Sequence, residues 1–196
     1  SHWRLSSGRS GAFMFYTQDM RMLVKTIDAA ECRFLCRVAD RYEAYLRREP
    51  SSFLVKFFGL HALSLYSRRF YFVVMGNHFP PKLKIHRTFD IKGSWEGRSG
   101  KPPYRGQRVT CRHCNAEYRY AAQSAGGAGT LCPQRVGGHQ PNIVLKDNDL
   151  TERLRLSHRR ARVVYGQLCR DAALLAGFGA TDYSLLLGVH NVEYDC

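Results

Sequence analysis

The sequence predicts an α+β fold with a mainly antiparallel sheet. Two strand-like runs at residues 12–17 and 20–27 are separated only by Gln18 and Asp19, a spacing typical of a β-hairpin. A helix follows, and later strand-like runs lack the regular alternation of strand and helix that builds parallel sheets. Pairing between neighbouring strands therefore explains the order better than long crossover connections do.

The first helix has clear boundaries. Asp28, with Glu31 three residues later, has the form of a capping box, and Pro50 ends the helix after about Arg48. Apolar residues recur at helical spacing and predict the buried face: Leu35, Val38, Ala39, Tyr42, Tyr45 and Leu46. Three arginines at intervals of four, Arg33, Arg37 and Arg41, lie on another side of this helix.

The rest of the chain divides into further elements and one insertion. Residues 99–141 are rich in Gly, Ala, Pro and Arg and contain three of the cysteines, so they read as an insertion. The other elements are expected in this order: strands at 54–60, 70–75 and 83–91, a helix at about 151–176 that ends before Gly177 and Gly179, and a strand at 182–190.

Composition restricts the class of protein. The chain has 196 residues, of which 44% are hydrophobic and 12% aromatic, and this supports a folded core. The formal net charge of +14 implies an anionic partner, which is a membrane leaflet, a nucleic acid or a phosphate-bearing ligand. The longest strongly apolar stretch, Phe70 to Met75, falls far short of the ~18 residues of a membrane span, so any membrane contact should be peripheral.

The cysteine count and the chain ends give two further expectations. Seven cysteines, an odd number, include one Cys-x-x-Cys pair, which favours a reduced intracellular protein over a disulfide scaffold. The chain begins with Ser1 and stops at Cys196 directly after a strand-like run. We therefore expect a fragment of a longer protein.

Lys25 is the first candidate for chemistry. It shares a strand face with Leu23 and Ile27, so its stem could pack against them while its amine reaches water. Alternatively, the amine neutralises the phosphates of a nucleotide beneath the preceding loop, which contributes Gly8, Ser10 and Gly11. Residue position alone leaves both interpretations open.

Residues 75–79 are a second candidate. The strand that ends at Met75 runs into Gly76-Asn77-His78-Phe79. The stretch is either a buried strand and a turn, or an interlobe hinge in which the backbone at Met75, Asn77 and His78 binds an adenine edge.

Charged residues at strand ends are the third candidate. Asp90 and Lys92 end one strand-like run, and Asp182 begins another. Asp182 is either a turn residue, or a general base or magnesium ligand at the mouth of a cleft. Lys82, Lys84 and His86 alternate with apolar residues and form a basic side, which is either solvated or attracts an anionic headgroup. A second basic helix face is formed by Arg153, Arg155, His158, Arg159, Arg160 and Arg162. If the basic side and the two arginine-rich helix faces are coplanar, they form a membrane-docking face; otherwise they are solvated surfaces.

The insertion contains a candidate zinc site. Cys111 and Cys114, followed by Cys132 and His139, supply four ligands in a plausible order, with 17 residues between Cys114 and Cys132. His113 or a water is an alternative fourth ligand. We favour a structural zinc, because little else would order a Gly/Ala-rich loop of this length. Incidental thiols in a disordered insertion are the alternative.

Several segments, in order, resemble the phosphatidylinositol phosphate kinases. The most characteristic are Phe89-Asp90-Ile91-Lys92-Gly93-Ser94 and Asp182-Tyr183-Ser184-Leu185-Leu186. The other segments that are similar to this family are Ser7-Gly8-Arg9-Ser10-Gly11-Ala12-Phe13, Val24-Lys25-Thr26, Phe57-Phe58-Gly59-Leu60, Phe72-Val73-Val74-Met75 and Lys146-Asp147-Asn148-Asp149-Leu150. The resemblance spans most of the chain and the first two-thirds of such a catalytic domain.

This resemblance implies a kinase-like fold of the PIPK/SAICAR synthase-like type. Residues 1–98 would form the N-lobe, residues 99–141 the insertion and residues 142–196 the start of the C-lobe. It also implies the activity: Mg²⁺-assisted transfer of the γ-phosphoryl group of ATP to an inositol ring hydroxyl of a phosphatidylinositol phosphate. A phosphatidylinositol-4-phosphate 5-kinase is the type expected. The resemblance implies that the partner is the anionic phosphoinositide surface of the cytosolic leaflet, and no nucleic-acid partner is expected. It also implies that the protein is cytoplasmic and binds this membrane peripherally.

The resemblance implies roles for individual residues. Lys25 looks like the ATP-phosphate lysine, and Asp182 like the catalytic aspartate, on the opposite wall of one nucleotide crevice. Residues 75–79 look like the adenine hinge, and Asp90, Lys92 and Arg98 border the substrate and nucleotide phosphates.

Three departures from the family pattern matter. The family's second metal-binding aspartate, in an Ile-Ile-Asp context, and its activation loop do not occur before Cys196, so we expect this segment alone to be inactive or very weak. Trp95 and Glu96 stand where the family usually has threonine. The cysteine insertion lies outside the common core. Two other functions stay open: a non-catalytic phosphoinositide-binding module or pseudokinase, and a zinc-ribbon nucleic-acid binder.

Overall fold

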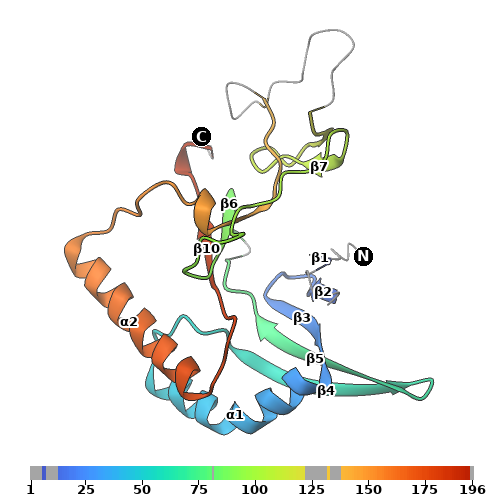
Figure 1. Ribbon diagram of the computed structural model, residues 1–196, viewed down its shortest axis with the longest axis vertical. Helices are drawn as coiled ribbons and strands as arrows, with labels where there is room; N and C mark the ends of the chain where they lie inside the picture. Colours follow the sequence, from blue (N-terminus) through green and yellow to red (C-terminus); the bar gives the residue numbers. More distant parts are fainter. Residues whose placement is uncertain (1–5, 8–12, 81, 122–131, 133–137, 195–196) are drawn as a thin grey trace. The chain divides into compact units, whose positions relative to one another are not determined.

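The computed structural model describes residues 6–7, 13–80, 82–121, 132 and 138–194 (Figure 1). Contacts within the chain define two units. Unit 1 comprises Ser1–Lys82 and Leu156–Thr181, and unit 2 comprises Leu83–Arg155 and Asp182–Cys196. The lobe boundaries expected from the sequence stay a prediction.

A five-stranded antiparallel sheet forms the centre of unit 1. Its strands are β1 (Ser6–Ser7), β2 (Phe13–Tyr16), β3 (Met22–Ile27), β4 (Phe57–Leu65) and β5 (Arg68–Gly76). They lie in the order β1-β2-β3-β5-β4, and all four pairings are antiparallel. The predicted α+β class with mostly antiparallel pairing is confirmed.

The hairpin expected from residues 12–27 is present as the β2–β3 pair, but its connection is longer than the predicted two residues. The Asp19 carboxylate accepts hydrogen bonds from the Thr17 hydroxyl at 2.6 Å and the Arg21 amide at 3.1 Å, and Met20 has a φ of 57°. The connection therefore closes around the side chain of Asp19, which is a common role for aspartate in turns.

Helix α1 (Ala29–Arg48) begins where the sequence predicts. The Asp28 carboxylate accepts hydrogen bonds from the Ala30 and Glu31 amides at 2.8 and 2.7 Å, and Glu31 accepts one from the Asp28 amide at 3.0 Å. The capping box is thus confirmed. Of the predicted buried face, Val38, Tyr42 and Tyr45 are fully buried, whereas Ala39 is exposed.

Helix α2 (His158–Gly177) begins at His158 and not near Thr151 as predicted. Ser157 caps it by accepting a hydrogen bond from the Arg160 amide at 3.4 Å, and residues 150–157 are not helical. The basic residues of this stretch have adequate helix propensity, but propensity alone does not place a helix end without its cap.

Asp171 of α2 is the centre of a buried network in unit 1. This residue is only 4% exposed, yet its carboxylate is well satisfied. It accepts hydrogen bonds from Tyr45 of α1 at 2.6 Å, Ser52 at 2.8 Å, the Phe53 amide at 2.8 Å and Gln167 at 2.8 Å. These bonds tie α1, α2 and the segment before β4 together.

Unit 2 contains a three-stranded sheet and a small hairpin. In the sheet, β6 (Arg87–Ile91) lies between β10 (Leu185–Val189), which is antiparallel to it, and β9 (Val144–Lys146), which is parallel to it. The hairpin consists of β7 (Arg108–Thr110) and β8 (Glu117–Arg119). Two short 3₁₀ helices, Asp147–Asp149 and Val192–Tyr194, follow β9 and β10.

The expected basic side at residues 82–86 is not continuous in the structure. The strand begins only at Arg87, and His86 is 1% exposed. The Lys84 amine donates a hydrogen bond to the His113 carbonyl. The backbone carbonyl oxygen of Lys84 lies 2.7 Å from Nδ1 of His190. The prediction of one solvated basic face was wrong for Lys84 and His86, because the side chains of both residues contact residues distant in the sequence.

No helix among the described residues is long and apolar enough to cross a membrane.

Candidate functional site

Lys25 lies on β3 in unit 1, between Met14 of β2 and Val73 of β5 in the sheet register. Its Nζ lies 4.0 Å from Oε1 of Glu31 in the first turn of α1, and its side chain is 34% exposed. The amine is therefore reachable from solvent and has only a loose ion pair, which suits the neutralisation of an anionic ligand.

The predicted hinge is also in unit 1, at the end of β5. Met75 is paired with Leu23 of β3 and Phe57 of β4. The amide of Gly76 donates a hydrogen bond to the Lys56 carbonyl at 2.9 Å, and the amide of Asn77 donates one to the Arg21 carbonyl at 2.9 Å.

These bonds narrow what the hinge can offer to a ligand. The Asn77 side chain donates to the Met20 carbonyl at 2.8 Å and accepts from the Phe79 amide at 3.2 Å. Burial, followed by the charge of Lys56, lowers the pKa of His78, so its imidazole is neutral near pH 7. The backbone amides of Gly76 and Asn77 are therefore both engaged within the chain.

The glycine loop joins β1 to β2, whose register pairs Ser7 with Phe13. Its candidate residues Gly8, Ser10 and Gly11 lie outside the described residues.

Unit 2 brings together the two segments that were singled out at strand ends. Strand β10 runs antiparallel to β6 with Leu185 opposite Ile91, so the residues just before β10 lie beside those just after β6. As a result, the Lys92 amine forms a hydrogen-bonded ion pair with Oδ1 of Asp182. The hydrogen bond from Lys92 lowers the pKa of Asp182, whose side chain is 81% exposed.

A second ion-pair cluster supports the same strand end. Asp147, directly after β9, accepts hydrogen bonds from the Lys92 and Gly93 amides at 2.9 and 2.8 Å and from Nε of Arg98 at 2.7 Å. Gly93 has a φ of +75°, a conformation that favours glycine. The Arg98 guanidinium also lies 3.4 Å from Oδ2 of Asp90.

The ionisation of Asp147 follows from these contacts. Burial alone raises the pKa of this carboxyl, but the hydrogen bonds from Arg98, Gly93 and Lys92 outweigh it, so the pKa is far below the usual range. Asp147 is therefore a permanent anion that fixes the turn after β6 and the guanidinium of Arg98.

Asp147 is a site residue that the sequence reasoning did not single out. It lies in the segment Lys146-Asp147-Asn148-Asp149, which contributed to the family resemblance without an assigned role. A carboxylate directly after a short apolar strand was the available signal. The contact became evident only when β9 paired with β6.

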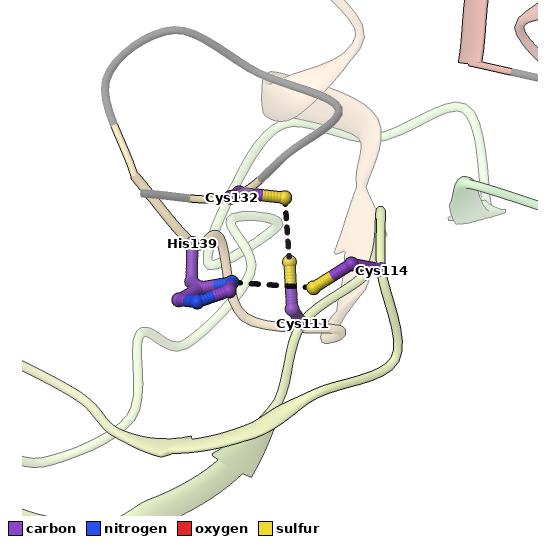
Figure 2. Close-up of side chains that lie close together, drawn as sticks. All are labelled: Cys111, Cys114, Cys132 and His139. Carbon is purple, nitrogen blue, oxygen red and sulfur yellow. Dashed lines mark hydrogen bonds between the residues drawn. The ribbon is translucent and has the colours of Figure 1, made fainter. Parts of the chain in front are cut away.

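The structure groups the predicted site residues in three places. Unit 1 contains Lys25, Met75, Asn77 and His78, whereas unit 2 contains Asp90, Lys92, Arg98 and Asp182. A separate cluster in unit 2 contains Cys111, Cys114, Cys132 and His139 (Figure 2). The expected crevice between Lys25 and Asp182 stays a prediction.

The cluster of cysteines contains His139 as its histidine and not the alternative His113. The four ligand atoms of Cys111, Cys114, Cys132 and His139 all lie within 4.8 Å of one another. His113 instead stacks on His86, with ring centroids 6.3 Å apart.

Two features are typical of a kinase-like α+β domain. Strand β3 carries Lys25 and leads into the capped helix α1. Lys92 and Asp182 form an ion pair at one end of the antiparallel strands β6 and β10. The comparisons identify the family. The family model described as Phosphatidylinositol-4-phosphate 5-Kinase matches residues 2–196, so the chain belongs to this family.

Named relatives agree with this assignment. The chain is 30% identical over 192 residues to phosphatidylinositol 4-phosphate 5-kinase its3 of Schizosaccharomyces pombe, a match that covers 96% of this chain and 22% of the relative. It is 33% identical over 187 residues to phosphatidylinositol 4-phosphate 5-kinase 9 of Arabidopsis thaliana, which covers 95% of this chain and 19% of the relative. The chain thus spans about a fifth of the length of the curated relatives that it matches.

Proposed function

We propose that the chain is part of a lipid kinase that transfers the γ-phosphoryl group of ATP to the inositol 5-hydroxyl of phosphatidylinositol 4-phosphate. Family membership and the names of the relatives support the reaction class. The observation that carries the proposal is the ion pair of Lys92 with Asp182, because it joins the two most characteristic motifs across ninety positions of sequence.

The candidate residues of unit 1 fit a nucleoside triphosphate. The Lys25 amine is accessible and only loosely paired with Glu31, so it can neutralise phosphate charge without breaking a strong internal bond. The loop of Gly8, Ser10 and Gly11 would lie over the phosphates. Carbonyl groups at Met75 and Asn77 and the His78 amide would hold the adenine edge.

The carboxylate of Asp182, which lies beside the end of β6, also fits Mg²⁺. This ion prefers oxygen ligands and commonly uses one or two carboxylates, with substrate phosphates and water as the other ligands. Asp182 offers an exposed carboxylate, and its lowered pKa keeps it ionised at neutral pH. When bound, Mg²⁺ neutralises charge on the phosphoryl group in transfer.

The chain's own side chains supply positioning. Lys92 holds the Asp182 carboxylate, which accepts a hydrogen bond from the ring hydroxyl and orients it for in-line attack. Because its pKa is lowered, Asp182 is a weak base before bond formation, so orientation is its first task and proton acceptance follows as the hydroxyl becomes more acidic. Arg98, fixed by Asp147, borders the phosphates as a permanent cation.

We further propose that the protein works on the cytosolic leaflet as a peripheral membrane protein. The net charge of +14 favours an anionic phosphoinositide surface, with each basic residue near it contributing about 1 kcal/mol. Lys84 and His86 are engaged inside unit 2, so the exposed arginines in the first turn of α2, Arg159 and Arg160, are better candidates for this contact.

The test is a radiolabel transfer assay with the full-length protein and vesicles that contain phosphatidylinositol 4-phosphate. Lys25→Ala and Asp182→Asn should each lower the rate by about 100-fold or more. Lys101→Ala, at an exposed lysine, is the matched control and should keep the wild-type rate. The 196-residue segment alone should be inactive or very weak.

The other functions predict different outcomes. A binding module or pseudokinase would keep its cellular function after Lys25→Ala. A zinc-ribbon nucleic-acid binder would bind duplex or single strands with an affinity that falls steeply with salt. Robust transfer by Lys25→Ala protein would contradict the proposed role of this lysine.

A further inference from the structure

Three thiols and one imidazole converge in unit 2 from two separate stretches of chain. Cys111 directly follows β7 and Cys114 lies in the turn before β8, whereas Cys132 and His139 come from the later part of the insertion (Figure 2). The Sγ atoms of Cys111 and Cys132 are 3.8 Å apart, and Sγ of Cys114 is 3.3 Å from Nδ1 of His139. Among the described residues, this is the one group of three or more potential metal ligands.

These separations match the edges of a tetrahedral metal site. Zinc–sulfur bonds of about 2.3 Å and zinc–nitrogen bonds of about 2.0–2.1 Å place neighbouring ligand atoms roughly 3.5–3.8 Å apart. All four ligand atoms lie within 4.8 Å of one another, so side-chain movements of about 1 Å complete the tetrahedron. A disulfide between Cys111 and Cys132 would instead need a sulfur–sulfur distance of about 2.05 Å.

The backbone around the first two cysteines is shaped like a metal-binding turn. The His113 amide donates a hydrogen bond to Sγ of Cys111 at 3.4 Å, and the Asn115 amide donates one to the Cys111 carbonyl at 3.0 Å. Asn115 has a φ of 60°, a conformation that asparagine tolerates better than most residues. The turn therefore holds the side chains of Cys111 and Cys114 on the same side.

Two of the four ligands are buried, and Cys114 and His139 are partly exposed. Cys111 and Cys132 are 0% and 2% exposed, and the ring of Tyr118 stacks on His139 with centroids 5.2 Å apart. A closed set of four protein ligands is typical of structural zinc sites, whereas catalytic sites keep an open position. Cysteine and histidine together favour zinc over the hard ions Mg²⁺ and Ca²⁺.

We propose that Cys111, Cys114, Cys132 and His139 bind one structural Zn²⁺ ion. The three cysteines coordinate as thiolates and release their protons to solvent, and His139 coordinates through Nδ1 as a neutral imidazole. This inference does not depend on the proposed kinase activity.

The position of the site shows what the ion stabilises. It links the β7–β8 hairpin to the segment that leads into β9, where Cys111 forms a bridge with Pro141 and the Arg112 amide donates to the Gln140 carbonyl at 2.9 Å. Strand β9 ends just before Asp147, which holds the turn after β6. The zinc ion thus fixes the segment that precedes β9, the strand that ends directly before Asp147.

Metal analysis under reducing conditions tests the proposal without any activity measurement. The full-length protein, purified without added chelator, should contain about one zinc per chain attributable to this site, measured by inductively coupled plasma mass spectrometry. Loss of a residue that only supports a metal ligand lowers metal affinity by about 10- to 100-fold. Cys114→Ser and His139→Ala remove ligands themselves, so each should lower the zinc affinity by more than this. Cys36→Ser, at an exposed cysteine of α1 outside the cluster, is the matched control and should keep the wild-type zinc content.

A second measurement covers variants that fail to fold. Wild-type protein stripped of zinc should bind Co²⁺ and develop the intense visible absorption of tetrahedral thiolate coordination, and Zn²⁺ should abolish it. Wild-type protein that lacks zinc and gives no such spectrum would overturn the proposal. Zinc content unchanged in both Cys114→Ser and His139→Ala would also overturn it, because the metal would then lie elsewhere.

Discussion

Two buried polar clusters of this protein solve the same electrostatic problem differently. In unit 1, the Asp171 carboxylate is surrounded by hydrogen-bond donors, namely two hydroxyls, one amide N–H and one side-chain amide. In unit 2, three thiols and one imidazole nitrogen lie within 4.8 Å of one another. The first cluster is compensated by the chain itself, whereas in our proposal a zinc ion compensates the thiolates of the second.

The comparison shows how donor chemistry decides what a buried site requires. Hydroxyl and amide groups are locally available donors, so a helix pair can satisfy one carboxylate with its own residues. Cysteine sulfur is a weak donor and a weak acceptor, so the three thiols and the His139 imidazole gain little from one another. The proposed zinc ion accounts for their convergence, and the difference between the two clusters can be tested.

Removal of zinc should have the largest effect. A chelator in excess should unfold the insertion, because structural zinc sites contribute about 10–16 kcal/mol of apparent binding free energy at pH 7. Thermal unfolding followed by circular dichroism should show a lower midpoint for the wild type and for Cys36→Ser. The midpoint of Cys114→Ser should be low already and should not respond to the chelator. Equal midpoints with and without chelator would argue against a metal-dependent fold.

Substitution of Asp171 should have the next largest effect. Asp171→Ala removes the acceptor of the buried Tyr45 hydroxyl and one of the two acceptors of the Gln167 amide, and we expect a loss of about 3 kcal/mol in the free energy of unfolding. Urea denaturation measures this loss, with Asp40→Ala on the exposed side of α1 as the control. Chelator should lower the stability of Asp171→Ala further, since the clusters lie in different units.

The pH dependence separates the Asp171 network from the rest of the protein. Burial raises the pKa of Asp171, but the hydrogen bonds from Tyr45, the Phe53 amide and Gln167 outweigh it, so the folded-state pKa is below the usual value. The stabilisation is therefore fully present above the unfolded-state pKa of about 4 and is lost as the pH falls through the folded-state pKa. The difference in unfolding free energy between wild type and Asp171→Asn should be constant from about pH 7 to 5 and shrink below about pH 4. A difference that persists unchanged at pH 3 would contradict this account.

The smallest effect is expected at an exposed ion pair. Arg47 and Glu43 are one helical turn apart on α1, 2.7 Å from each other, and both are largely exposed. Glu43→Gln should change the unfolding free energy by about 0.5 kcal/mol or less, because such pairs are screened by water and salt. Urea denaturation at low and high salt checks this value. A larger loss would mean that charge at the surface matters as much as the buried clusters do.

Local features of the sequence were predictable to the residue. The capping box of Asp28 and Glu31 uses contacts within one turn, so its residues alone identify it. The start of α2 was misplaced because Ser157 at its N-cap is a weaker indication than a capping box. The side chains of Lys84 and His86 were assigned to a basic face, since alternation says which residues share a side but not what covers that side.

By itself, the sequence determined the α+β class, the first hairpin and capped helix, the four cysteine and histidine positions, and the motifs that place the chain in its family. These depend on neighbouring residues or on residue type. Only the tertiary structure decided that Asp147 fixes the turn after β6, that Lys92 pairs with Asp182, and that His139 rather than His113 joins the thiols. Each of these contacts joins segments far apart in the chain, and strand pairing and packing select such partners where local spacing does not.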